Sequence, residues 1–476
     1  MPPQSDMDTT NDEKKKTSHK SMCTENTHDQ NDPTKSQSSS SSSPATITQA
    51  VPIIVLMDMF AVATVVPLMN QYYLMAGVTS ARQRELLSAL YSSSQIVGGL
   101  VIGALSDAKL LSRRSILFIS FIGSALSYGL IMKKSLWALA CSRVLVGFVK
   151  QTMTVSTALL AMHTTPEERA THMGRLKASA TIAWVAGPSA GAFLYKYVNP
   201  YAPAMCASIL FIILTIVASV IVPKDTTTMD APQSLKESSP GAKKSSVSSF
   251  SSNLRSCFTS MSLASVIIST LLFSWITRAT SYASMSSYYE ELYGIEPHQR
   301  GYLSSYQMIL RLIVSASLVR PILDHSGGER RAAVFAAAAL SLATLVETRA
   351  SLLMFIVFLN PVISVSVSLL ELSLKTLVTL VAPKESISSV LAALDVLQNA
   401  AAVTVPFYRT AVFLVLEKIC NYIGKGVDKE ATMEGDPDPY LWLISSAVHW
   451  AFVAIVFWIL LVFYGSGKRL TNVATG

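Results

Sequence analysis

The sequence has few charged residues and no pattern among its cysteines. Of its 476 residues 14% are charged and half are apolar, whereas roughly 25% charged residues is usual in soluble domains. This composition argues against a water-soluble enzyme, because most stretches beyond residue 50 are too apolar to be half exposed to water. The five cysteines show no close pair and no C-x-x-C spacing, so neither a disulfide framework nor a zinc site is indicated: Cys23, Cys141, Cys206, Cys257 and Cys420.

Sequence signatures of catalysis are also missing. There is no Walker motif, no H-E-x-x-H, no metal-spaced cluster of Cys and His, and no G-x-S-x-G. We therefore expect no enzyme activity, no cofactor and no bound metal. The net charge of +8 does not indicate nucleic acid, because the basic residues lie in short clusters between long apolar runs.

Apolar runs long enough to cross a membrane fill the chain beyond residue 50. A bilayer core of about 30 Å needs about 20 apolar residues per helix. Twelve such runs are separated by polar or charged breaks, at residues 51–75, 86–106, 115–132, 136–162, 173–197, 203–222, 262–288, 301–323, 331–347, 351–381, 387–416 and 440–464. The sequence therefore predicts an all-α membrane protein with twelve transmembrane helices.

Polar segments divide these runs into two groups of six. Residues 1–50 are polar, contain an unbroken serine run, and predict a disordered cytoplasmic tail. A segment rich in Ser, Thr and Lys predicts a cytoplasmic linker at residues 223–261. The expected organisation is thus a six-helix half at 51–222, the linker, a second half at 262–464, and a short cytoplasmic tail at 465–476.

Basic residues indicate the orientation of the chain. Lys and Arg are more frequent in the tails, the linker and the alternate loops on the same side than in the loops on the other side. The positive-inside rule then places both termini in the cytoplasm and residues 417–439 outside. No sequence feature distinguishes the plasma membrane from an endolysosomal membrane, so both stay open.

An internal repeat supports two related halves. Asp107, Arg113 and Arg114 recur in the second half with the same spacing, and two other pairs recur at corresponding helix ends with almost the same offset. Parallel repeats of this kind surround a central site in many transporters. The recurring residues are Asp324, Arg330 and Arg331, then Tyr288 and Tyr289 for Tyr72 and Tyr73, and Gln299 and Arg300 for Gln83 and Arg84.

Three motifs in the first half carry a family resemblance. The loop from Gly103 through Asp107 to Arg113 and Arg114 resembles the G-x-L-x-D-x-x-G-R-R loop of the major facilitator superfamily, with two extra residues and Ser112 in place of Gly. The fifth run resembles the family's G-x8-G-x3-G-P-x2-G-G antiporter motif. Its matching residues are Gly174, Gly187, Pro188 and Gly191, with alanine in place of two glycines. The fourth run contains Arg143 and Gly147 in the family's R-x-x-x-G pattern, with Lys150 one turn further along.

This resemblance spans about residues 50–465 and implies a function. In the family the loop Asp and Arg residues latch the halves in the outward-open state, which assigns Asp107, Arg113, Arg114, Asp324, Arg330 and Arg331 to a cytoplasmic latch with Gly103. Small residues in the fifth helix allow close packing and Pro188 bends it, so gating and ordinary packing are both open interpretations. Within the superfamily the chain is most similar to animal orphan carriers related to tetracycline-efflux and organic-cation-transporter-like members.

Ionisable residues inside the runs are candidates for the central cavity, because burying one in a membrane helix costs about 2.5 to 3.5 kcal/mol. The central candidates are Asp58, Arg143, Lys150, Arg311 and Asp395. Desolvation raises the pKa of a carboxyl group and a nearby cation lowers it, so a carboxyl group that faces Arg143 or Lys150 can exchange a proton. Glu371 and Lys375 can neutralise each other, and Arg278 and Arg409 can extend outward to the membrane surface.

We therefore expect a monomeric secondary transporter that moves a small organic solute by alternating access, coupled to protons and embedded in the lipid bilayer. The embedded basic residues favour an anionic or amphiphilic solute, whereas the family resemblance favours organic cations and drugs. The alternative is a membrane sensor or partner platform that does not transport and uses the same scaffold.

Overall fold

The computed structural model describes residues 44–107, 110–222, 260–280, 289–290, 292–382, 387–423 and 438–463. These residues are almost entirely helical, and they contain no strand. Most of the predicted N-terminal tail, almost all of the predicted linker and the predicted C-terminal tail lie outside the described residues, so those expectations stay predictions. The first helix begins at Pro44 rather than at residue 51.

The first six predicted runs are all helical. In chain order they are α1 (Pro44–Val65) continued by η1 (Val66–Leu68) and α2 (Met69–Met75), α3 (Ala81–Asp107), α4 (Arg113–Ile131), α5 (Leu136–Val149) followed by α6 (Thr152–His163), α7 (Pro166–Tyr197) and α8 (Ala202–Ile221). The fourth run is thus two helices rather than one.

The second six runs are helical as well, and three of them contain π-helical turns. They are α10 (Met261–Thr280), α12 (Pro297–Ile313) continued by η3 (Val314–Leu318) and α13 (Val319–Ser326), α14 (Glu329–Glu347), α15 (Leu352–Met354) continued by η4 (Phe355–Leu359) and α16 (Asn360–Val381), α17 (Ile387–Tyr422), and α18 (Pro439–Phe457) continued by η5 (Trp458–Phe463).

Ten of these twelve segments are long and apolar enough to cross a membrane by themselves. The other two are α7 and α14, which both carry charged residues in their first turns, namely Glu167 and Glu168 in α7 and Glu329 to Arg331 in α14. Both helices pack against segments that are apolar enough to span a membrane: α7 packs against α1 and α12, and α14 packs against α16 and α18. The predicted twelve-helix architecture is confirmed.

Local sequence explains where several helices begin. Ser112, Thr165 and Asp438 precede α4, α7 and α18, and each side chain accepts a hydrogen bond from a backbone N–H of the first turn. Such caps satisfy amide groups that have no partner within the helix. Ser112, which stands where the family loop has Gly, therefore has a capping role here.

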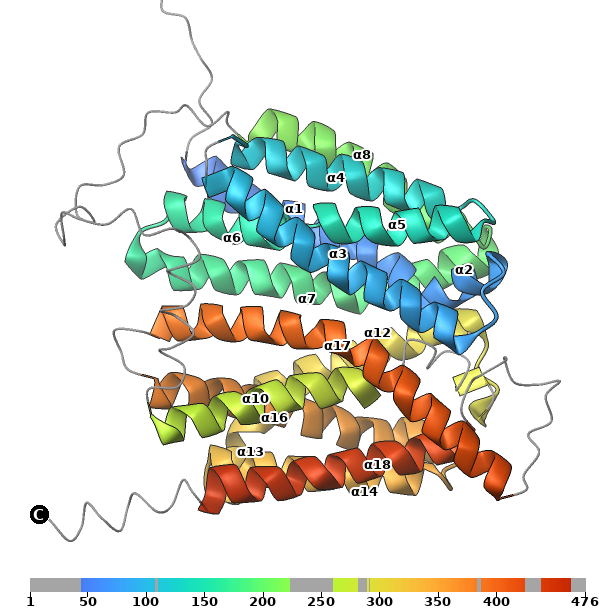
Figure 1. Cartoon of the computed structure of the whole chain (residues 1–476). Coiled ribbons are helices and arrows are strands. Elements are labelled where there is room, and N and C mark those ends of the chain that lie inside the picture. The colour runs from blue at the N-terminus through green and yellow to red at the C-terminus, as the bar shows by residue number, and fades with distance from the viewer. Residues whose placement is uncertain are drawn as a thin grey trace, which may run out of the picture. The chain divides into compact units, whose positions relative to one another are not determined.

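Two apolar cores lie in separate parts of the chain. One is made by buried residues between Ile47 and Val222, and the other by buried residues between Leu263 and Leu461. Figure 1 shows α1 to α8 together in blue to green and α10 to α18 together in yellow-green to red. The two groups touch where α7 packs against α12 and where α3 packs against α17.

Matching hydrogen bonds relate the two groups of helices. Arg114, the second residue of α4, donates to the carbonyl of Ser219 at the end of α8, and Arg330, the second residue of α14, donates to the carbonyl of Leu461 in η5. Further along the same helix pairs, the carbonyl of Ala125 accepts from Ser208, and Ser341 donates to the carbonyl of Ala447. The pairing of α4 with α8 thus recurs in the second half as a pairing of α14 with α18, although the sequence repeat aligns Arg330 with Arg113 rather than with Arg114.

Candidate transport site at the break in the fourth helix

The fourth membrane segment is interrupted in its middle. α5 ends at Val149, Lys150 has a non-helical backbone (φ −74°, ψ 85°), and α6 begins at Thr152. The sequence predicted that Lys150 would lie one helical turn beyond Gly147. The structure corrects this, because the helix has already ended at Val149. Irregular backbone at membrane depth is tolerated only inside the protein or beside a water-filled cavity.

Two glycines hold the end of α5 tightly against α3. A Cβ atom on Gly147 would lie 2.0 Å from Ser94 Oγ, and one on Gly98 would lie 2.0 Å from the carbonyl oxygen of Phe148. Neither position has room for a side chain. Gly147 of the predicted R-x-x-x-G pattern thus allows α5 to reach α3 just before the break.

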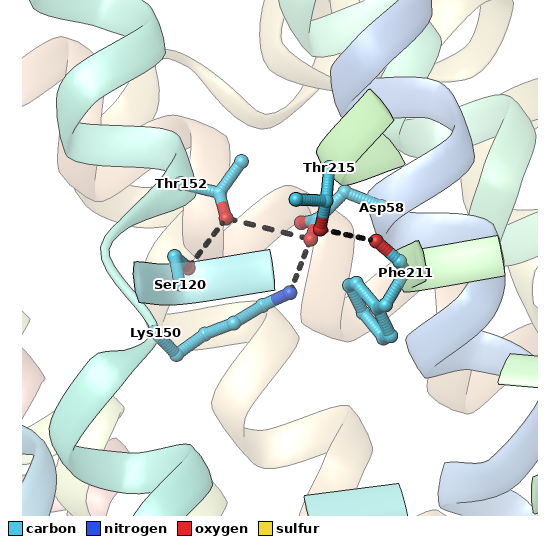
Figure 2. Close-up of polar contacts among 6 residues, drawn as sticks. All are labelled: Asp58, Ser120, Lys150, Thr152, Phe211 and Thr215. Carbon is cyan, nitrogen blue, oxygen red and sulfur yellow. Dashed lines mark hydrogen bonds and ion pairs between the residues drawn. The ribbon is translucent and has the colours of Figure 1, made fainter. Parts of the chain in front are cut away.

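The break brings Lys150 to Asp58 on α1. Figure 2 shows Lys150 Nζ donating to Asp58 Oδ1, and Thr152 Oγ1 donating to the same oxygen at 3.4 Å. Ser120 Oγ lies 3.1 Å from Thr152 Oγ1 and extends the network to α4. The Asp58 side chain is 0% exposed and that of Lys150 is 12% exposed. This is a desolvated ion pair at the junction of three membrane segments.

The two oxygens of Asp58 have different surroundings. Oδ1 accepts from Lys150 and Thr152, whereas Oδ2 has no hydrogen-bond partner among the described residues. Lys150 Nζ also lies 4.6 Å from the centre of the Phe211 ring, a cation–π contact that keeps the ammonium group in place. Lys150 and Thr152 therefore leave one oxygen of the buried carboxylate open.

Arg143 does not join this ion pair. It is buried, and its Nε and Nη2 atoms have no hydrogen-bond partner among the described residues. Its charge acts on the hydroxyl groups of Tyr73, Tyr91 and Tyr128. Tyr128 also lies within electrostatic reach of Asp58, so this buried tyrosine is close to both the arginine and the ion pair.

The predicted central residues of the second half are elsewhere. Arg311 on α12 acts electrostatically on Glu371 of α16, whose Oε1 accepts from Lys375 Nζ at 2.5 Å. Glu371 and Lys375 therefore pair along one helix, which is the mutual neutralisation expected from the sequence. Asp395 on α17 is exposed, which distinguishes it from the fully buried Asp58.

The latch residues lie at helix ends, but no latch is visible among the described residues. Asp107 is the last residue of α3 and its side chain is outside the described set; Asp324 is exposed near the end of α13. Arg114 and Arg330 instead donate to helix-end carbonyls, as described above. Arg331 lines a cavity of about 970 Å³ beside α13. Gly103 has no neighbour within 4 Å of its Cβ position.

The antiporter-like motif of the fifth run lies on α7, and two of its glycines allow close packing. A Cβ atom on Gly187 would lie 2.5 Å from Ala63 Cβ, and one on Gly191 would lie 2.0 Å from the Thr64 carbonyl oxygen, both on α1. Gly174, by contrast, has nothing within 4 Å. Pro188 is buried within α7 and its carbonyl oxygen faces Gly301 of α12. The motif therefore joins α1, α7 and α12.

The two groups of helices also contact each other at the end that the sequence predicts to be outside. Glu85 on α3 forms a 2.8 Å ion pair with Arg409 on α17, and both side chains are buried. This corrects the expectation that Arg409 extends outward to the membrane surface. Glu85 was missed because it lies one residue before the predicted run at 86–106, so only its buried partner could have revealed it.

A second contact joins α7 to α12 at the same end. Ser189 Oγ donates to Ser305 Oγ at 2.7 Å, and Lys196 Nζ lies 3.1 Å from His298 Nε2. A Cβ atom on Gly301 would lie 2.4 Å from the Pro188 carbonyl oxygen. We call this set of contacts the outer α7–α12 contact.

Comparison with known proteins identifies a family and a fold. Residues 52–406, more than half of the chain, match the family model described as Major Facilitator Superfamily. Among solved structures, the nucleoside transporter NupG superimposes with a TM-score of 0.66 at 11% identity over 87% of this chain and 99% of that chain. A structure described as the human organic anion transporter MFSD10 gives 0.53 at 15% identity, over 87% and 99%.

Curated relatives match shorter stretches. The class C tetracycline resistance protein of Escherichia coli is 35% identical over 126 residues, which are 26% of this chain and 31% of that protein. Major facilitator superfamily domain-containing protein 10 of Bos taurus is 30% identical over 158 residues, 33% of each chain. The chain thus spans about a third of the length of these relatives.

Proposed function

Because this chain belongs to the major facilitator superfamily, we propose that it is a secondary active transporter, which moves a small organic solute by alternating access and couples that movement to protons. The observation that carries the proposal is the ion pair of Asp58 and Lys150 at the break between α5 and α6. A transporter needs a site at membrane depth that can change its charge, and this pair supplies one.

The coupling step follows from competition for one carboxylate. Lys150 and a proton both bind Asp58, and they cannot do so fully at the same time because a neutral carboxyl group no longer attracts the ammonium group. A proton reaching Oδ2, the unpartnered oxygen, therefore weakens the ion pair and releases Lys150. Loss of the proton restores the pair. Binding of solute beside Lys150 then depends on whether Asp58 is protonated.

The energy of such coupling is sufficient for accumulation. One elementary charge that crosses 100 mV supplies about 2.3 kcal/mol. Since about 1.36 kcal/mol changes an equilibrium tenfold, one proton can support a gradient of nearly fiftyfold in a neutral solute. No second energy source is required by this estimate.

The site and the relatives favour different chemical classes of solute. The embedded basic residues favour an anion, as does the likeness in fold to the organic anion transporter. The tetracycline resistance proteins favour a drug-like amphiphile. A first panel should therefore contain organic anions, tetracycline and nucleosides.

The decisive experiment measures solute flux by the purified full chain in liposomes, with and without an imposed pH gradient. Saturable uptake that follows the gradient supports the proposal. Asp58→Asn keeps the size of the side chain but cannot exchange a proton, so it should abolish accumulation while allowing equilibrative exchange. Glu417→Gln is a matched control, because Glu417 is an exposed carboxylate that pairs only loosely with Arg82, at 3.7 Å.

Two outcomes would contradict the proposal. If Asp58→Asn still accumulates solute with the wild-type pH dependence, Asp58 is not the coupling site and Asp395 becomes the next carboxylate to test. If no solute on the panel moves while a partner protein binds the tails, the chain is a sensor or partner platform.

A further inference from the structure

One histidine lies in the outer α7–α12 contact, away from the ion pair of Asp58. His298 is in the first turn of α12 and is 8% exposed. Its Nε2 atom lies 3.1 Å from Nζ of Lys196, near the end of α7, and its Nδ1 atom lies 3.1 Å from Oε2 of Glu296. Both ring nitrogens are therefore within hydrogen-bond distance of a charged side chain, one on α7 and one at the start of α12.

These partners determine which ring nitrogen carries a proton. A lysine ammonium group has three donors and no acceptor, so Nε2 must be the unprotonated acceptor. Glu296 is an acceptor when ionised, so Nδ1 must carry the proton and donate to it. The observed contact between α7 and α12 is consequently a contact of neutral His298.

We propose that His298 is a proton-binding site on the outer side and that proton binding there breaks the outer α7–α12 contact. A proton on Nε2 removes the acceptor that Lys196 needs and places two cations 3.1 Å apart. The same proton strengthens the bond from Nδ1 to Glu296, because both partners are then charged. His298 therefore stays with Glu296 near the start of α12, and Lys196 of α7 loses its hydrogen bond to His298.

Other charged groups near this site do not replace the lost contact. Arg300, on the same helix, forms an ion pair with Glu290. On α7, the hydroxyl group of Tyr195 lies within electrostatic reach of Arg300 and Glu290. η1, which also packs against α12, contains only Val66, Pro67 and Leu68 and has no titratable side chain. Lys196 is thus the charged group of α7 that faces His298.

The remainder of the outer contact is short and depends on close approach. It consists of the Ser189–Ser305 hydrogen bond and the packing of Gly301 against Pro188 and Ala192. Both require α7 and α12 to lie within van der Waals distance. Loss of the Lys196–His298 bond at the end of the contact therefore favours separation, and acid on the outer side should favour the outward-open state.

The test measures opening directly in the empty full chain in lipid nanodiscs. The five native cysteines are replaced, and spin labels are attached through Met205→Cys on α8 and Tyr440→Cys on α18, two exposed positions at the outer end. Distances between the labels are measured by pulsed electron paramagnetic resonance at about pH 7.5 and about pH 5.5, on either side of the ordinary titration range of histidine.

We expect the ratio of long to short distances to rise about tenfold or more at the lower pH, the size of effect that loss of a hydrogen bond to a charged group has on an equilibrium. In His298→Gln the side-chain oxygen can still accept from Lys196 but does not titrate, so the ratio should stay low at both pH values. His325→Gln is the matched control, since His325 is exposed beside α14, and it should respond like the wild type.

Lys196→Gln gives a second test that does not alter the histidine. Without the ammonium group, protonation of His298 no longer brings two cations together, so the pH response should disappear. An unchanged response in either His298→Gln or Lys196→Gln would overturn the proposal, as would a wild-type chain that does not open in acid. The inference rests on alternating access, but the readout needs no solute, so its failure is distinguishable from a failure to transport.

Discussion

Removing the ammonium group of Lys150 should destabilise the protein strongly, because Asp58 would be left as a buried carboxylate without a cation. The proposed change is Lys150→Met, which keeps most of the length of the side chain but removes the ammonium group and its cation–π contact with Phe211. The remaining partner of Asp58 would be Thr152, at 3.4 Å. Breaking a buried ion pair by deleting one partner typically costs about 3 to 5 kcal/mol.

The size of this loss should depend on pH. A proton on Asp58 would neutralise the orphaned carboxylate, so the loss should shrink in acid. A loss of about 3 to 5 kcal/mol corresponds to a fall in the thermal midpoint of roughly 3 to 5 °C for a chain of this size. The assay is thermal unfolding of the purified chain in nanodiscs, compared with the wild type over a series of pH values.

A second substitution in the same chain isolates the ion pair from the packing of Lys150. In Lys150→Met with Asp58→Asn neither charge is present, and replacing both partners of a buried pair is often neutral or stabilising. The double variant should therefore recover most of the lost stability and lose the pH dependence. If the single Lys150→Met variant is as stable as the wild type at neutral pH, the pair is not desolvated as the structure indicates, and the coupling argument fails with it.

Three other sets of substitutions test separate features. Gly191→Ala should destabilise the protein by about 1 to 3 kcal/mol through overpacking against Thr64. Gly174→Ala should be neutral, because nothing lies near its Cβ position. Thermal unfolding of the two variants distinguishes the effect of close packing from that of the glycine-to-alanine change itself. Asp107→Asn should reduce transport strongly with normal expression, and Asp324→Asn should reduce it less because Arg320 replaces the family's helix-end glycine; equal flux in wild type and both variants would leave these residues only a topological role. A cysteine introduced at residues 223–261 should resist an impermeant thiol reagent in intact cells after correction for native thiols, and labelling there would refute the predicted orientation.

The helices were predictable from the sequence because the length and polarity of each run follow from the thickness of the bilayer. Even α7 and α14, which fail a test of apolarity alone, were recovered because their neighbours on both sides were clear. Asp58 was identifiable for a related reason, since a lone carboxyl group in an apolar run is costly wherever the helix ends are drawn.

The sequence left Arg143 and Lys150 as the two candidate partners of Asp58, and the structure pairs it with Lys150. The break in the fourth segment could not be predicted. No proline stands at Lys150, and the interruption depends on α3 pressing against Gly147 and on the attraction of Asp58, which are contacts between distant parts of the chain. The ion pair of Glu85 with Arg409 was missed for the same reason. A side chain that can extend to the membrane surface and one that meets a buried partner look alike in sequence.

The ion pair of Asp58 and Lys150 also has an electrical consequence. Together the two side chains carry no net charge, so a carrier with this pair intact can reorient at this site without work against the membrane potential. Once a proton neutralises Asp58, the released Lys150 leaves one positive charge at membrane depth, and moving it through 100 mV involves about 2.3 kcal/mol. The voltage dependence of such a carrier then belongs to the protonated form, while the empty return step is electrically silent.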